Sequence, residues 1–239
     1  MICSFTLNFK PIILGRKIRK YSNYNSIREI LKLKGLKDDE LKKIVVTNFI
    51  TKDKFFQNKN YSLKISSIDS EVTLKILREF FLIKLEGEIL NISGNDFFLL
   101  NIHYTNINSR QLLLENIKYQ NKVEINFITP CFFKFGSRLI TSFEPLYVIS
   151  NLLAKLKHSS LLENENFNIS KEEIQKIKYE ILLEKRLEIK DMNIQGLIGK
   201  VIYYVENDEN LNRRLNNLLT FAFFSGIGYR TQEGYGQIR

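Results

Sequence analysis

The order of strand-like and helix-like stretches over the first hundred residues limits the fold more than any other feature of the sequence. Apolar residues recur with period two in the expected strands and with helical spacing in the expected helices. The expected strands are Ile2–Phe9, Ile44–Ile50, Tyr61–Ile68, Ile83–Ile92 and Phe97–Tyr104, and the expected helices are Ser26–Lys34 and Glu71–Phe81 with a short one in Lys37–Lys43. Apart from one extra strand, this order is a ferredoxin-like βαββαβ plan.

The second half follows a similar order, although its residues show no internal repeat. Its expected elements are a strand at Lys122–Ile128, a helix at Pro145–Leu156, strands at Ile177–Ile189 and Asn193–Val205, a helix at Glu209–Phe224 and a terminal strand. We therefore expect the α+β class, with two tandem ferredoxin-like (RRM-like) βαββαβ domains and a C-terminal glycine-rich loop. The expected domains are 1–104 and 122–239, and the polar stretch 105–121 is the expected linker.

The glycine-rich stretch follows the last helix, and four glycines fall within the eleven residues from Gly226 to Gly236. Glycine permits positive φ and a close approach of another backbone or a phosphate. The stretch lacks the spacing of a dinucleotide-binding turn or a P-loop. One alternative is a purely structural turn. The other is contact with a nucleic-acid backbone, for which the candidates are Gly226, Gly228, Tyr229, Arg230, Thr231, Gly234, Tyr235 and Gly236.

The net charge favours a polyanionic partner. The chain has 36 Lys and Arg against 26 Asp and Glu, a formal charge of +10. A genome of low GC content favours lysine codons and would produce part of this excess without a functional reason. Basic residues gather in the N-terminal part, where they are either solvated side chains or a phosphate track. The candidates for that track are Arg16, Lys17, Arg19 and Lys20, which precede Tyr21 and Tyr24, and then Lys42, Lys43, Lys52 and Lys54.

A second aromatic and basic stretch is Phe132–Gly136. Pro130 is expected to end the preceding strand, and Lys134 is the only lysine among the phenylalanines that follow. Packing of Phe132 and Phe135 in the core is the first interpretation, and base stacking beside an RNA-binding Lys134 is the other.

Composition argues against several classes of function. Cys3 and Cys131 are too few for a disulfide framework, and His103 and His158 lack metal-ligand spacing. No acidic cluster suggests a two-metal nuclease, so we expect neither a metal site nor a cofactor. No apolar run is long enough to span a bilayer, and the first residues alternate like a strand. We therefore expect a cytoplasmic protein without a membrane partner.

Several motifs together resemble one family. They are Thr129-Pro130 followed by Phe133-Lys134-Phe135-Gly136, the helix that starts at Pro145, Gly196–Val201, and the terminal Ala222–Gly236. The chain resembles the Cas six (Cas6) endoribonucleases, which process CRISPR repeats and belong to the repeat-associated mysterious protein superfamily. The resemblance implies binding of CRISPR repeat RNA and metal-independent cutting of precursor CRISPR RNA into guide RNAs. In that reaction the ribose 2′-hydroxyl attacks the adjacent phosphate, and the glycine loop contacts the RNA.

The sequence departs from the family at the general base. Many members place a histidine after the first helix, which corresponds to about Gly35–Lys43, and this segment contains none. If the chain cleaves RNA, the catalytic candidates are Tyr21, Tyr24, Lys42, Lys43 and Lys52. The alternative is a catalytically weak or inactive subunit that holds repeat RNA in a CRISPR effector complex. Other subunits and a second copy of the chain are further candidate partners, and a ferredoxin-like interaction module without RNA is a third interpretation.

Overall fold

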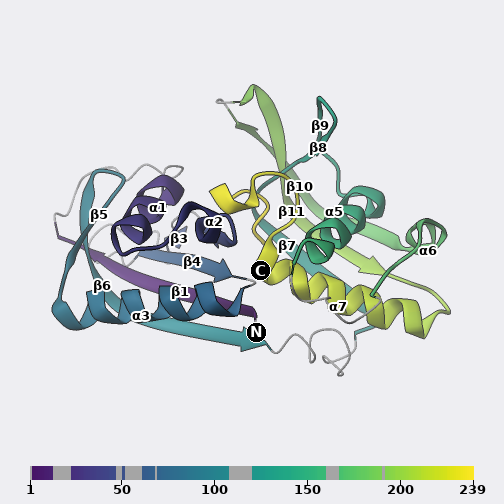
Figure 1. Cartoon of the computed structure of the whole chain (residues 1–239). Helices are drawn as coiled ribbons and strands as arrows, with labels where there is room; N and C mark the ends of the chain where they lie inside the picture. Colours follow the sequence, from purple (N-terminus) through teal and green to yellow (C-terminus); the bar gives the residue numbers. More distant parts are fainter. Residues whose placement is uncertain are drawn as a thin grey trace. The chain divides into compact units, whose positions relative to one another are not determined.

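Two units of the same architectural class make up the chain. The computed structural model describes residues 2–12, 23–46, 50–51, 61–67, 69–107, 120–159, 167–189 and 192–239. Contacts divide the chain into one unit of Met1–Asn106 with Gln232–Gly234 and a second of Ile107–Thr231 with Tyr235–Arg239. Each unit contains antiparallel strands and packed helices (Figure 1).

The first unit is built on one antiparallel sheet. Its elements are β1 (Ile2–Pro11), α1 (Asn23–Leu33), α2 (Asp38–Leu41), β2 (Ile44–Val46), β3 (Ile50–Thr51), β4 (Tyr61–Ser67), α3 (Ser70–Glu86), β5 (Ile89–Ile92) and β6 (Asn95–Ile107). The strand order is β2-β4-β1-β6-β5, and β3 also pairs with β4. This is the expected ferredoxin-like arrangement, and β5 is the extra strand.

One face of this sheet carries the core of the first unit. Every second residue of β1, from Cys3 to Phe9, is buried. These side chains form one apolar cluster with Ile27 of α1 and with Ile76 and Phe80 of α3. Both helices therefore pack against the same face of the sheet, as the period of two along β1 predicts.

Helix α3 is longer than predicted, so the predicted strand Ile83–Ile92 is wrong at its beginning. Asp69 caps the helix by accepting hydrogen bonds from the N–H groups of Glu71 and Val72. Ile83 continues the buried stripe of the helix, which ends only at Gly87, a residue with φ of 64°. Strand β6 runs to Ile107, three residues into the stretch expected as the linker, and residues 108–119 of that stretch lie outside the described ranges.

The second unit repeats the plan and adds to it. Its elements are β7 (Lys122–Cys131), β8 (Phe133–Phe135), β9 (Arg138–Ile140), α5 (Pro145–Lys157), α6 (Lys171–Lys176), β10 (Lys178–Ile189), β11 (Ile194–Tyr204), α7 (Glu209–Ser225) and the 3-10 turn η3 (Thr231–Glu233). The sheet order is β10-β11-β7, and Ile238 bridges Phe127 on the free side of β7. The hairpin β8–β9 and the helix α6 were not predicted.

Strand β7 does not end at Pro130, as the sequence suggested, but continues to Cys131. Proline lacks an N–H, but its carbonyl accepts a hydrogen bond of 2.8 Å from Gly236. The strand tolerates a proline here because the hydrogen bond to the C-terminal segment uses the carbonyl of Pro130 and requires no N–H from it.

The core of the second unit lies between its sheet and α5 and α7. The rings of Phe127 and Phe143 are 4.7 Å apart, and the hydroxyl of the buried Tyr203 donates to the carbonyl of Phe143 at 2.7 Å. Burial raises the pKa of Tyr203 well above its ordinary value. Phe132 is buried as expected, but Phe135 is 46% exposed, so its predicted core packing is wrong.

Candidate nucleic-acid interface

The glycine loop, Gly226–Gly236, is a closely packed structure in which two backbone segments touch. The N–H of Ile227 donates to the carbonyl of Gly236 at 2.8 Å. A Cβ atom on Gly236 would lie 1.6 Å from the carbonyl oxygen of Ile227, and the φ angle of Gly236 is 60°. A larger residue at this position would therefore clash with the facing backbone.

The loop is fastened to the end of β7 and to α5. Tyr229 donates its N–H to the carbonyl of Phe132 at 2.7 Å, and the N–H of Gly228 donates to Oδ1 of Asn151 at 2.8 Å. A Cβ on Gly228 would come within 2.5 Å of the Phe132 carbonyl oxygen. The glycines thus serve close packing in the protein, as the structural interpretation of this stretch expected.

A lysine from α5 holds the loop at the end of α7. The ammonium of Lys155 donates to the carbonyls of Ser225 (3.2 Å) and Gly226 (2.9 Å) and to Oγ1 of Thr231 (3.0 Å). These carbonyls belong to the C-terminal end of α7, where a positive charge is favourable. Burial works against that charge and lowers the pKa of Lys155 to about 7, while the three acceptors match the three donors of the ammonium form.

The residues of the loop predicted to bind RNA differ in exposure. Five are buried, namely Gly226, Gly228, Thr231, Gly234 and Gly236, while Tyr229, Arg230 and Tyr235 are partly exposed. The Oγ1 atom of Thr231 is used by Lys155. The side chains that can reach a ligand are therefore those of the three partly exposed residues.

Three of the predicted residues lie together. The ammonium of Lys134 is 5.3 Å from the ring centroid of Tyr229, and the guanidinium carbon of Arg230 is 5.7 Å from the same ring. Behind them the buried Phe132 contacts the rings of Tyr229 and Tyr235. Two cations around one partly exposed aromatic ring suit a phosphate and an adjacent base.

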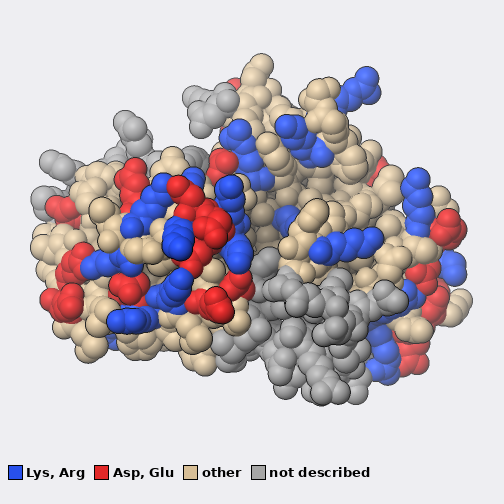
Figure 2. Space-filling model, in the orientation of Figure 1, with Lys and Arg blue, Asp and Glu red and all other residues tan. Residues whose placement is uncertain are grey.

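The unpredicted hairpin β8–β9 extends this basic and aromatic surface. Lys134 lies in β8 next to Phe135, whose ring contacts that of Tyr147 at 5.4 Å. Arg138 opposite Phe135 is exposed. Among the charged side chains on the face shown in Figure 2, Lys and Arg predominate in the part of the second unit that carries this hairpin, whereas both signs are mixed over the first unit. The turn Gly136–Ser137 between two short apolar runs was the signal that could have revealed the hairpin.

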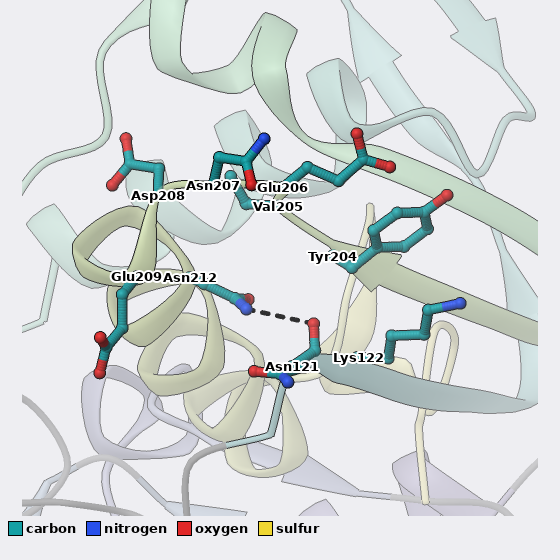
Figure 3. A pocket seen from close by; sticks show the side chains of 9 residues that line it. All are labelled: Asn121, Lys122, Tyr204, Val205, Glu206, Asn207, Asp208, Glu209 and Asn212. Carbon is teal, nitrogen blue, oxygen red and sulfur yellow. Dashed lines mark hydrogen bonds between the residues drawn. The ribbon is translucent and has the colours of Figure 1, made fainter.

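A pocket of the second unit differs from this surface in its charge. It has a volume of about 680 Å³ and lies at the start of α7, where the side-chain amide of Asn212 donates to the carbonyl of Asn121 (Figure 3). Its lining carries the carboxylates of Glu206, Asp208 and Glu209 against the single ammonium of Lys122. This charge balance does not suit a phosphate backbone.

Of the predicted catalytic residues, Tyr24, Lys42 and Lys43 are described, all in the first unit. Tyr24 lies in α1, and Lys42 and Lys43 follow α2. The remaining candidates, Tyr21 and Lys52, and the basic residues Arg16, Lys17, Arg19 and Lys20 lie outside the described residues.

The described candidates have different surroundings. Tyr24 packs against the core, and burial raises its pKa, although the guanidinium of Arg28 acts in the opposite direction. The ammonium of Lys43 is 2.6 Å from the carboxylate of Asp69. Lys42 is exposed and forms no ion pair with any other described residue. Lys42 is therefore better placed than Lys43 to meet an external phosphate.

The histidines and acidic residues provide no alternative centre in the described ranges. His103 is exposed on β6, and His158 is the exposed C-cap of α5. The described side chains include no group of three or more His, Cys, Asp or Glu that could hold a metal ion. Within the same residues, no helix has the length and apolar character needed to cross a membrane.

Replacing Lys155 with methionine tests the packing of the loop. The change leaves two carbonyls and one hydroxyl without their donor, and we expect the free energy of unfolding to fall by about 1–3 kcal/mol. Urea denaturation measures it, and Lys157→Met, at an exposed position of the same helix, is the matched control. Equal stability of the two variants would contradict the role of Lys155.

The pH dependence provides a second readout of the same variant. The folded pKa of Lys155, about 7, is below the ordinary lysine value, so the unfolded chain binds more protons above pH 7. The contribution of Lys155 to stability should therefore rise with pH from about 7 to 8.5, below the range in which free thiols ionise. The difference between the wild type and Lys155→Met should follow this rise.

Comparisons with known proteins match the second unit of the chain to a family. Residues 125–238 match the family described as CRISPR-associated endoribonuclease Cas6. No curated protein matches the chain.

Solved structures resemble the chain over its full length. A Cas6 product complex has a TM-score of 0.76 at 16% identity, covering 100% of this chain and 99% of the other. Cas6 from Thermus thermophilus has a TM-score of 0.67 at 17% identity, with coverage of 100% and 97%. A Cas6-related protein from Pyrococcus furiosus has 0.61 at 16%, with coverage of 100% and 98%. The C-terminal unit therefore matches the Cas6 family in sequence, and the chain as a whole shares the fold of these structures.

Proposed function

We propose that this protein binds CRISPR repeat RNA and cuts precursor CRISPR RNA into guide RNAs. The observation that carries the proposal is the cluster of Lys134, Tyr229 and Arg230, which presents two cations and an aromatic ring on a rigid loop. All three residues lie within the stretch that matches the family. Phosphates would pair with the cations, and a base would stack on the ring.

The names of similar structures support an RNA ligand. Two of them are a product complex and a substrate mimic complex of Cas6, and another is a RAMP protein that binds different RNA substrates. At 15–16% identity these structures share the fold with this chain. The assignment of repeat RNA to this protein is our proposal.

The proposed reaction is attack of a ribose 2′-hydroxyl on the adjacent phosphate. The new O–P bond closes a 2′,3′-cyclic phosphate, the bond to the 5′ oxygen breaks, and the proton lost by the 2′-hydroxyl is balanced by one gained by the leaving 5′ oxygen. A base, an acid and a cation beside the phosphate each accelerate this exchange, and side chains can supply all three without a metal ion.

Tyr24 and Lys42 are better suited to act as the general acid and as the cation beside the phosphate than as the general base. Because burial raises the pKa of Tyr24, the phenol keeps its proton at neutral pH and can donate it to the leaving oxygen. The exposed ammonium of Lys42 can stabilise negative charge on the phosphate. With no histidine in Gly35–Lys43, the base is the function least well supplied. Tyr21 and Lys52 stay candidates for it.

Because a general base is not evident among the described residues, a second function is also considered. A subunit that holds repeat RNA in an effector complex and cuts it slowly or not at all needs the same loop and the same cations, but no base. The two functions therefore differ in catalysis and agree in binding.

Cleavage of labelled repeat RNA in EDTA separates the two functions. We expect cleavage products that end in a cyclic phosphate, and a 2′-deoxy substitution at the scissile nucleotide should abolish them because it removes the nucleophile. Binding of the repeat without any product would favour the second function. Products that require an added divalent cation would contradict the proposed metal-independent step.

The two neighbouring lysines provide a matched test of the cation. We expect Lys42→Ala to slow cleavage by about tenfold or more, with little effect on RNA affinity, because it removes charge that acts mainly in the transition state. Lys43→Ala should retain most of the rate, since its ammonium is already paired with Asp69. Single-turnover kinetics measures both. An unchanged rate in Lys42→Ala would remove this residue from the mechanism.

RNA affinity tests the loop cluster directly. We expect Arg230→Ala and Lys134→Ala each to weaken binding and to reduce the slope of affinity against salt by about one, the value for one lost phosphate contact. Arg213→Ala is the control, because Arg213 lies on α7 and pairs with Glu209 at 2.6 Å. If all three variants lose the same affinity, the effect reflects net charge and the cluster has no special role.

A further inference from the structure

The hairpin β8–β9, which projects from the second unit in Figure 1, has an aromatic face that the loop cluster does not use. Phe135 at the end of β8 is 46% exposed, although Phe132 and Phe133 just before it are buried. The ring of Phe135 lies edge-on to that of Tyr147 on α5 at 5.4 Å, and Tyr147, itself partly exposed, also contacts Phe133 at 6.0 Å. A buried ring thus supports two rings that are open to a ligand.

A cation accompanies these rings. Arg138 of β9 lies directly opposite Phe135 in the hairpin, so both side chains project from the same face. Arg138 is exposed and forms no ion pair with another described residue. From Phe133 to Lys157 the sequence has one acidic residue, Glu144, against four Lys and Arg. The surroundings of the rings therefore favour a polyanionic ligand.

The two faces of the hairpin carry the same combination of groups. Side chains alternate along β8, so Lys134 projects from the face opposite to that of Phe133 and Phe135. On its own face the ammonium of Lys134 lies 5.3 Å from the ring centroid of Tyr229. Each face therefore combines a cation with an aromatic ring, which suits a phosphate and the base next to it.

Only an unpaired RNA strand can use both faces. The hairpin is a two-stranded ribbon, so a flexible strand can pass around its end from one face to the other. In a paired A-form helix the bases are stacked on one another, and the deep, narrow major groove keeps protein side chains away from them. Bases that stack on aromatic side chains come from single-stranded loops, bulges and ends. A base on Phe135 must therefore be unpaired.

We propose that the face formed by Phe135, Arg138 and Tyr147 is a second nucleotide site, which takes an unpaired base of the bound RNA. The base stacks on the ring of Phe135, and Arg138 pairs with a neighbouring phosphate. The substrate is then an RNA that is single-stranded where it passes the end of the hairpin, beside the nucleotide at Tyr229. This inference rests on the proposed RNA binding and does not depend on cleavage.

Tryptophan fluorescence tests the second site directly, because the sequence contains no tryptophan. Phe135→Trp places a single indole at the site, and stacking of a base on it should quench most of its fluorescence. Phe98→Trp is the matched control, since Phe98 is 40% exposed on β6 of the first unit, and its fluorescence should not change. The anisotropy of labelled RNA measures binding in the same samples.

Three RNA probes establish whether the base must be unpaired. They are the repeat RNA, an oligoadenylate of about twenty nucleotides, which exceeds a typical single-strand site, and the same oligoadenylate paired with oligouridylate. Phosphate contacts are independent of sequence, so all three should bind at low salt. We expect the repeat RNA and the free oligoadenylate to quench the indole of Phe135→Trp. The duplex should leave it unchanged, because its bases cannot reach the ring.

The salt dependence of affinity separates stacking from charge. Phe135→Leu should weaken binding of the repeat RNA by about fivefold or more without changing the slope of affinity against salt, because stacking releases no counterion. Phe135→Tyr, which keeps an aromatic ring, should retain the affinity. Arg138→Ala should reduce the slope by about one, the value for one lost phosphate contact. Urea denaturation of each variant shows that a lost affinity is not an unfolded chain.

Two results would overturn the second site while leaving the proposed RNA binding intact. One is repeat RNA that binds Phe135→Trp without quenching its fluorescence, which is also the result expected if this face contacts another protein. The other is quenching by the duplex equal to that by the free oligoadenylate, since the base would then not need to be unpaired. A wild type that binds none of the probes would contradict the proposed function itself, and the second site with it.

Discussion

The close approach of the Gly236 backbone to Ile227 is the constraint on which the second unit depends. A contact with no room for a Cβ atom brings the C-terminal segment back along β7, where Ile238 bridges Phe127 and Arg239 exchanges hydrogen bonds with Asn126. The segment thereby occupies the position of the fourth strand of a ferredoxin-like sheet. The same contact fixes the tight turn from which Tyr229 and Arg230 project. The fold of the second unit and the candidate interface therefore depend on the same contact between the backbones of Ile227 and Gly236.

Much of the fold follows from sequence because the apolar periods are long and regular. Strands β1, β10 and β11 and the helices α5 and α7 lie close to their predicted limits. The errors have local causes. Ile83 suits a strand as well as a helix, so only tertiary packing shows that it completes the stripe of α3. The strands β8 and β9 have three residues each, too few for a visible period.

The candidate interface was only partly predictable. Lys134, Tyr229 and Arg230 were recognised by residue type and resemblance, and the structure brings them together although 95 residues separate Lys134 from Tyr229 (229 − 134). Lys155 escaped notice because a lysine on a helix usually points to solvent, and nothing local indicates that its ammonium meets three acceptors. The glycines were correctly recognised as unusual, but sequence could not distinguish a cradle for phosphate from a site where the protein's own backbones touch.

The attachment of the loop also has a consequence for folding order. The backbone contacts of Tyr229 with Phe132 and of Gly236 with Pro130 join residues about a hundred positions apart, so forming them costs the entropy of closing a long stretch of chain. The cluster of Lys134 with Tyr229 exists only after this closure. A chain that lacks these contacts has the same net charge, but it does not bring Lys134, Tyr229 and Arg230 together. The proposed recognition of RNA by these residues therefore requires the completed fold.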